Sequence, residues 1–561
     1  MTDDILEKKK ALVALLMQKG IMTQPDTLTS LASGQDLDRL FALAQQGAVS
    51  SKDLIDPASV RSVLEAEPSH RDSASDASRL SSPDATSDAS PDTAPDMTPD
   101  TAPDNTPNPA APGIPSEGYS SVTLPEKLSI PIPNPELGAP QPHEAFPLNI
   151  ITSYREDSKK REVKDFVAYF NARYQAISSM LVLRHELSNP TSIARLQGKP
   201  EKERVAFIGV VMEVKETKNK NILITIDDPS GKTTVLVSNN NRELLTEAKT
   251  LVPDEVIGFS GVIGRGLIYA DNIIWPDIPL TKELKKSPDE VYAIFLSDVH
   301  VGSKEFIEDK FDRFIEWING RIGNPEQREM VSKIGYAFII GDLVDGIGVY
   351  PNQQAGQNIP DIYAQYKRCA ELFARLPKHI NIIVSPGNHD ALRLAEPQPA
   401  IPEDIAPDLW ALPNVKMVSN PAWVNINQKD GFPGFDVLIY HGYSFDHYIA
   451  HVEDLRLNHG YDRPDLIMKF LLKRRHLGPT HTSRPYIPSA KDSLVIDRVP
   501  DFFISGHIHK TSISDYRNIT MVCSSCWQSK TDFQEKVGHH PEPARVPLVN
   551  LQTREVKILK F

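Results

Sequence analysis

Cysteine is scarce in this chain of 561 residues, which contains only three. So few thiols exclude a disulfide framework, and they fit a reducing compartment. Cys523 and Cys526 form a single CxxC with no second pair, so we interpret them as buried or incidental thiols rather than as a zinc site. Cys369 lies in a helical pattern and is predicted to belong to a core.

Long apolar runs are missing as well. The longest one near the N-terminus, residues 11–17, is too short to cross a bilayer, which takes about 20 residues. The first ten residues, MTDDILEKKK, place acidic residues first and lack the basic region and apolar stretch of a secretory signal. We therefore expect a cytoplasmic protein without a membrane span.

Excess positive charge is absent, because the net charge is -13 at pH 7. The tract 71–106 holds eight Asp and two Arg, a net charge of -6, so only -7 belongs to the rest of the chain. The overall charge is therefore a poor guide to partners. Divalent metals can offset clustered carboxylates, so a local site that binds a phosphodiester remains compatible with an acidic protein.

Several domains are expected from the length and from shifts in composition. Residues 1–48 show apolar positions at helical spacing and predict a small helical module, which either docks a partner or has no assigned role. Residues 49–148 are rich in Pro, Ser, Thr and Asp and include the repeat PDTA-PDMT-PDTA-PD. Such a segment cannot bury enough apolar surface to order itself, so we predict a disordered acidic linker.

A helical connector is predicted over residues 160–200, followed by short strands over residues 203–282. Five strands with one helix before the last two give the order of an oligonucleotide-binding (OB) fold, a small β-barrel. Such a barrel either binds single strands through stacking aromatics or only packs against its neighbours. The few aromatic residues in these strands favour packing or partner docking.

Residues 288–561 contain five apolar runs, and each ends in Asp, Asn or His where the predicted strand should stop. The runs are followed by Asp298-Val299-His300, Gly341-Asp342, Gly387-Asn388-His389-Asp390, His441-Gly442 and Gly506-His507-Ile508-His509. Helical segments lie between them, so an α/β domain is expected. Because ligands bind at the carboxyl ends of strands in such sheets, all five motifs are expected to converge on one crevice.

The motifs supply seven candidate metal ligands. They are Asp298, His300, Asp342, Asn388, His441, His507 and His509. Carboxylate, imidazole and amide oxygen without thiolate favour Mn²⁺, with Mg²⁺, Fe²⁺ and Zn²⁺ as alternatives. Seven ligands are too many for one ion with an open position, so two divalent ions are expected. Such a pair polarises a phosphoryl oxygen and activates water, which predicts hydrolysis of a phosphoester.

The ordered motifs DxH, GDxxD, GNHD, H and GHxH resemble the calcineurin-like metallophosphoesterase superfamily over residues 290–530. The resemblance implies that Asp298, His300 and His509 bind one metal. It implies that Asn388, His441 and His507 bind the other, with Asp342 bridging the two. His389 would be a catalytic acid that protonates the leaving oxygen, and Asp390 would orient it.

The predicted domain order resembles the small subunit of archaeal family D DNA polymerases, and the strings at residues 472–477 and 527–531 look like segments of that family. The resemblance implies a proofreading 3'-5' exonuclease that acts on single-stranded or primer-template DNA and forms a heterodimer with a large polymerase subunit. The basic stretch Lys469–His476 is interpreted either as a contact to phosphates or to that partner, or as a solvated helix face.

Two alternatives remain open from the sequence. One is a metallophosphatase for another class of substrate, which would leave the barrel and the tethered module without a purpose. The other is a scaffold subunit without catalysis, which predicts broken ligand motifs, whereas every motif here is intact.

Overall fold

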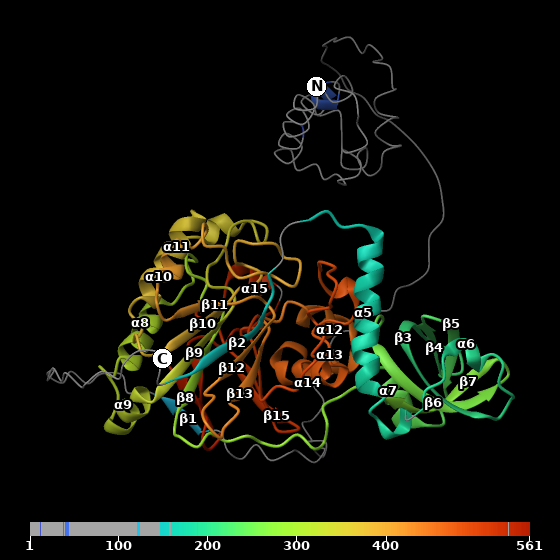
Figure 1. Cartoon of the computed structure of the whole chain (residues 1–561). Helices are drawn as coiled ribbons and strands as arrows, with labels where there is room; N and C mark the ends of the chain where they lie inside the picture. The colour runs from blue at the N-terminus through green and yellow to red at the C-terminus, as the bar shows by residue number, and fades with distance from the viewer. Residues whose placement is uncertain are drawn as a thin grey trace, which may run out of the picture. The chain divides into compact units, whose positions relative to one another are not determined.

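The computed structural model describes residues 146–155, 159–187, 189–536 and 538–561, strand β1 (Ser120–Thr123) and six positions before residue 44 (Figure 1). The predicted N-terminal helical module and most of the predicted linker lie outside the described residues. Within the described part of the chain, no helix is both long and apolar enough to cross a membrane.

Two sheets form a sandwich, and all of their strands except β1 and β2 come from the C-terminal half of the chain. The seven-stranded sheet has the order β1, β18 (Val556–Lys560), β17 (Arg545–Asn550), β8 (Tyr292–Leu296), β9 (Ile334–Ile340), β10 (Asn381–Ser385) and β11 (Val415–Met417). The six-stranded sheet has the order β15 (Ser512–Tyr516), β16 (Ile519–Cys523), β14 (Phe502–Ser505), β13 (Phe435–Ile439), β12 (Ala422–Ile426) and β2 (Leu148–Ser153).

Helices cover the outer faces of both sheets (Figure 1). One set is α8 (Glu308–Ile318), α9 (Pro325–Ser332), η2 (Gln353–Gly356), α10 (Ile362–Phe373) and α11 (Pro407–Trp410). The other is α12 (Phe445–His451), α13 (Glu453–Leu457), η3 (Gly460–Asp462), α14 (Pro464–Arg474) and η4 (His481–Ser483). The short helix α15 (Asp532–Lys536) buries no residue and contacts the loop that follows β9. The predicted α/β architecture is therefore confirmed, with two packed sheets at its centre.

The alternation of side chains along β8 shows why the strands are buried on both faces. Ile294 and Leu296 pack on one side against apolar residues of α8 and α10. Ala293 and Phe295 point the other way, into a core shared by both sheets. Successive side chains of a strand point to opposite faces, so an unbroken apolar run is needed where both faces are covered.

A closed five-stranded barrel precedes the sandwich in the sequence and has the predicted OB-fold order. It consists of β3 (Arg204–Glu216), β4 (Ile222–Asp228), β5 (Gly231–Val237), α7 (Arg242–Ala248), β6 (Val256–Gly264) and β7 (Leu267–Ile274). Phe207 and Phe259 stack inside it with ring centroids 5.7 Å apart, and both are fully buried. These two rings therefore serve the barrel core and are not available for stacking on a nucleic acid.

The predicted connector is helical and is formed by α5 (Val163–Leu181), η1 (His185–Leu187) and α6 (Ile193–Leu196). The basic stretch Lys469–His476 was interpreted as a contact to phosphates or to a partner, or as a solvated helix face. Both interpretations are wrong for its last three residues, which are buried. Arg474 pairs with Glu255 of the barrel at 3.0 Å, and His476 bonds Asp492 at 2.9 Å. The end of the stretch therefore joins the barrel to the sandwich instead of facing phosphates or solvent, whereas Lys469 at its start is exposed.

Two strands lie in or begin within the segment predicted to be a disordered linker. β1 pairs in parallel with β18, and β2, which starts at Leu148, pairs with β12. The ring of Phe146 packs edge-on against Tyr336 with centroids 6.0 Å apart. The chain before the connector thus completes both sheets. The other domain boundaries stay predictions.

Candidate metal centre

The five motifs follow five strands of two sheets. β8, β9 and β10 are parallel neighbours in one sheet, and β13 and β14 are parallel neighbours in the other. Their carboxyl ends meet at the same edge of the sandwich, because Asp298 accepts a hydrogen bond from the backbone N–H of His507 at 2.9 Å. The expected crevice therefore lies between two sheets rather than at the edge of one.

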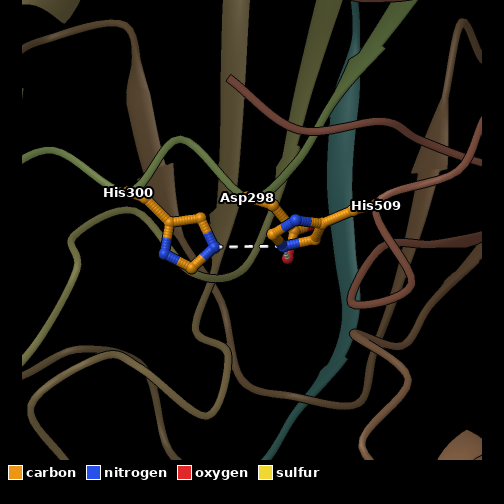
Figure 2. Close-up of side chains that lie close together, drawn as sticks. All are labelled: Asp298, His300 and His509. Carbon is orange, nitrogen blue, oxygen red and sulfur yellow. Dashed lines mark hydrogen bonds and ion pairs between the residues drawn. The ribbon is translucent and has the colours of Figure 1, made fainter. Parts of the chain in front are cut away.

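One group of ligands consists of Asp298, His300 and His509, whose side chains point toward one another in Figure 2. The Nε2 atoms of His300 and His509 are 3.1 Å apart, and His509 Nε2 lies 3.3 Å from Asp298 Oδ1. Asp298 and His300 are almost fully buried. Two imidazole nitrogens and a carboxylate oxygen thus face one point in the protein.

A second group contains Asp342, His441 and His507. His441 Nε2 lies 3.3 Å from Asp342 Oδ2 and 3.1 Å from Asn388 Oδ1. Asp342 Oδ2 is also 4.0 Å from His300 Nε2. Asp342 therefore stands between the two groups, in the place expected for a bridging carboxylate.

The backbone at these positions is unusual. Five candidate ligands have positive φ angles between 51° and 68°, in the left-handed region that side chains other than Gly rarely adopt: Asp298, His300, Asp342, His507 and His509. Each such residue costs on the order of 1–3 kcal/mol and persists only where the surroundings enforce it. Concentration of this strain at one edge of the sandwich is typical of a functional site.

The electrostatics of the centre favour a bound cation. Burial alone would lower the pKa of His441, but the charges of Asp342 and Asp298 raise it to about 10. Asp298 Oδ1 and His300 Nδ1 are buried atoms without a hydrogen-bond partner. Buried polar atoms are normally satisfied, so these carboxylate and imidazole donors fit divalent metal ions. The assignment of individual ligands stays a prediction.

His389 and Asp390 occupy different surroundings. His389 Nδ1 lies 2.8 Å from the backbone oxygen of Asp345, which holds the ring. Asp390 is buried and accepts hydrogen bonds from Gly387 N at 2.8 Å and from the Tyr366 hydroxyl at 3.0 Å. Burial and the charge of Asp342 raise the pKa of Asp390 to about 7. The expected orientation of His389 is thus provided by Asp345, while Asp390 fixes the loop backbone.

Three further residues of the centre were not among the site residues predicted from the sequence. Asp345 forms a metal-capable group with His300 and His389, and its Oδ1 lies 3.7 Å from His300 Nδ1. Asp446 Oδ2 is 2.9 Å from His507 Nε2, and Gln534 Nε2 is 3.0 Å from His509 Nδ1. The second Asp of GDxxD signalled Asp345, whereas no sequence pattern pointed to the other two.

Gly387 has no room for a side chain, which gives a first testable prediction. A Cβ there would overlap the Asp342 carboxylate and would lie 2.8 Å from His441 Cε1. We expect Gly387→Ala to weaken Mn²⁺ binding by about 10–100-fold, as the loss of an outer partner of a ligand does. Calorimetric titration would measure it. Gly356→Ala is the matched control, because no atom lies within 4 Å of its Cβ, and equal affinities in both variants would contradict the prediction.

Comparisons with known proteins agree with this geometry. Residues 293–511 match the family model of calcineurin-like phosphoesterases. The chain is 39% identical over 401 residues to the DNA polymerase II small subunit of Methanothermobacter thermautotrophicus, with 71% of this chain and 80% of the relative covered. It is 42% identical over 392 residues to that of Archaeoglobus fulgidus, with 70% and 76% covered.

The subunit of the same description from Pyrococcus furiosus is 39% identical, and 64% of its length is covered. The resemblance to polymerase small subunits, expected from the motifs and the domain order, is thereby confirmed. With a metal-capable phosphoesterase centre beside an OB-fold barrel, the chain belongs to the family of DNA polymerase II small subunits.

Proposed function

We propose that this chain is the metal-dependent 3'-5' exonuclease subunit of a two-subunit replicative DNA polymerase and acts in the cytoplasm. A large catalytic subunit would supply polymerisation, and this chain would remove nucleotides from single-stranded or mismatched ends. The observation that carries the proposal is the grouping of all seven candidate ligands where the strands of the two sheets end, with Asp342 between the groups. An intact centre of this kind argues against a scaffold role.

The seven candidate ligands would form two metal-binding positions. Asp298, His300 and His509 would hold one ion, and Asn388, His441 and His507 the other, with Asp342 contributing to both. Mn²⁺ is the metal that this donor set favours. When bound, the ions would polarise the phosphoryl oxygens and lower the pKa of a water molecule.

The chain's own residues would position the substrate and move a proton. In the hydrolysis, a bond forms between phosphorus and the water oxygen while the bond from phosphorus to the leaving 3' oxygen breaks. His389 would donate its proton to that oxygen, and the carbonyl of Asp345 fixes the ring by accepting from Nδ1. A histidine suits this task because its ordinary pKa lies near working pH.

The test is Mn²⁺-dependent digestion of 3'-labelled single-stranded DNA by the full chain, with and without its large subunit, beside a generic phosphomonoester. We expect loss of label from DNA and little turnover of the monoester. Hydrolysis of the monoester alone would replace the proposal by a phosphatase. No turnover of either substrate in the assembled enzyme would replace it by a scaffold.

A further inference from the structure

Two aromatic rings lie beside the metal centre without belonging to the core. Tyr350 and Phe533 stack with ring centroids 5.0 Å apart and an interplanar angle of 21°. Tyr350 is half-buried, and Phe533 is 43% exposed. Ile347 and Val349, on the same loop as Tyr350, are exposed too. A cluster of exposed apolar side chains marks an interaction site more often than an isolated one does.

Both segments that carry the rings contact residues of the metal centre. The ring of Tyr350 lies 6.2 Å from that of His389. Its loop is fixed by Gln353, which accepts from Val349 N at 2.9 Å and donates to Asp345 O at 2.7 Å. Phe533 sits on α15 next to Gln534, whose side-chain amide bonds His509 at 3.0 Å. The stacked pair is therefore held in a fixed position relative to the reacting groups.

We propose that Tyr350 and Phe533 form an aromatic platform on which an unpaired base of the DNA 3' end stacks, which makes the centre selective for single-stranded over paired ends. This inference rests on the proposed exonuclease function. Every nucleobase has a flat π-face, so aromatic platforms bind single strands with little regard to sequence. A base in a duplex is already covered by its neighbours and cannot reach the platform without unpairing.

The position of His389 specifies which nucleotide stacks. In the proposed hydrolysis His389 protonates the leaving 3' oxygen, and that oxygen belongs to the nucleotide that stays on the strand. Because Tyr350 lies beside His389, the platform receives the base of this penultimate nucleotide. A mismatch near the end leaves that base easier to unpair, so the platform would favour mismatched over correctly paired ends.

The experiment follows stacking directly, independently of cleavage. A single-stranded oligonucleotide with 2-aminopurine as its penultimate base is mixed with the full chain, with Ca²⁺ in place of Mn²⁺. Stacking quenches the fluorescence of 2-aminopurine, so we expect quenching at this position and much less when the probe base is placed in mid-strand or in a duplex. Phe533→Leu keeps apolar bulk but removes the ring.

We expect Phe533→Leu and Tyr350→Ala each to weaken the binding of this probe roughly ten-fold, in line with the contribution of one aromatic ring to base stacking. The preference for single-stranded over paired ends in Mn²⁺-dependent cleavage should fall by a similar factor. Tyr363→Ala removes another exposed aromatic, on α10, and serves as the matched control. Mn²⁺ titration of each variant checks that the centre itself is intact.

Unchanged quenching and unchanged strand preference in both platform variants would overturn the inference. If the variants lost only their association with the large subunit, the rings would instead be a protein-docking surface, and the inference would also fail. Absence of DNA cleavage by the unaltered chain assembled with its large subunit would overturn the exonuclease proposal alone, because the quenching measurement still decides whether a base stacks on the rings.

Discussion

The Asp342→Asn variant is expected to lose metal at both positions, whereas His389→Ala is expected to keep metal and lose turnover. Asp342 Oδ2 lies 3.3 Å from His441 Nε2 and 4.0 Å from His300 Nε2, so its charge serves both groups. Asparagine keeps the oxygen that accepts the backbone N–H of His389 at 2.8 Å, and the fold of the loop should therefore survive. Mn²⁺ affinity should fall by more than about 100-fold. Losing a residue that only hydrogen-bonds a ligand costs about 10–100-fold, and Asp342 is expected to be a ligand itself.

For His389→Ala, calorimetric Mn²⁺ titration should give nearly unaltered affinity, while kcat on single-stranded DNA should fall by about 10²–10⁴-fold, the usual contribution of a general acid. The exposed carboxylate of Asp312 on α8 provides the control, because Asp312→Asn should change neither quantity. Equal loss of metal in Asp342→Asn and His389→Ala would show that the two residues do not have separate roles.

The sequence located the strands of the centre because each apolar run ends at a ligand. The runs before Asp298, Asp342 and Asn388 correspond to β8, β9 and β10, as expected. The barrel was recognisable from the placement of one helix before its last two strands. The strands of the centre and the barrel could therefore be predicted from local periodicity and from the order of the elements along the chain.

Contacts between distant segments were not predictable in the same way. No local signal shows that β13 and β14 belong to a second sheet, or that β2 pairs with β12 some 270 residues later in the sequence. The partners of Asp390 and His476 depend on such contacts as well. A motif indicates which residues are suited to the chemistry, but only the packed backbone decides which group orients His389.

Asp492→Ala is expected to destabilise the protein by about 3–5 kcal/mol, the usual cost of removing one partner from a buried ion pair. The Asp492 carboxylate accepts from Arg173 Nε at 2.7 Å and from the Tyr169 hydroxyl at 2.7 Å, both on α5. It also lies 2.9 Å from His476 Nε2, in the phosphoesterase domain. All four side chains are buried, so the variant would leave Arg173 charged and unpaired between the connector and that domain.

Urea-induced unfolding of the full chain would measure how much the Asp492→Ala substitution lowers the free energy of unfolding. The matched control is Asp312→Ala, which breaks the exposed ion pair with Arg375 and should cost less than about 1 kcal/mol. Similar losses in the two variants would contradict a special role for the buried pair.

The same carboxylate makes this difference in stability depend on pH. Burial alone would raise the pKa of Asp492, but the charge of Arg173 and the bonds from His476 and Tyr169 hold it well below its ordinary value. A depressed pKa in the folded state stabilises the protein above the unfolded pKa, about 3.9, and the contribution is lost as pH falls below it. The difference between the unaltered chain and Asp492→Ala should therefore be constant near neutral pH and shrink by about 1.4 kcal/mol per pH unit below about pH 4. A difference that stayed constant down to pH 3 would mean that the Asp492 carboxyl has the same pKa in the folded and unfolded states, which would contradict the depressed pKa. A carboxyl that stayed neutral in the folded protein would instead make the difference fall as pH rises above about 4.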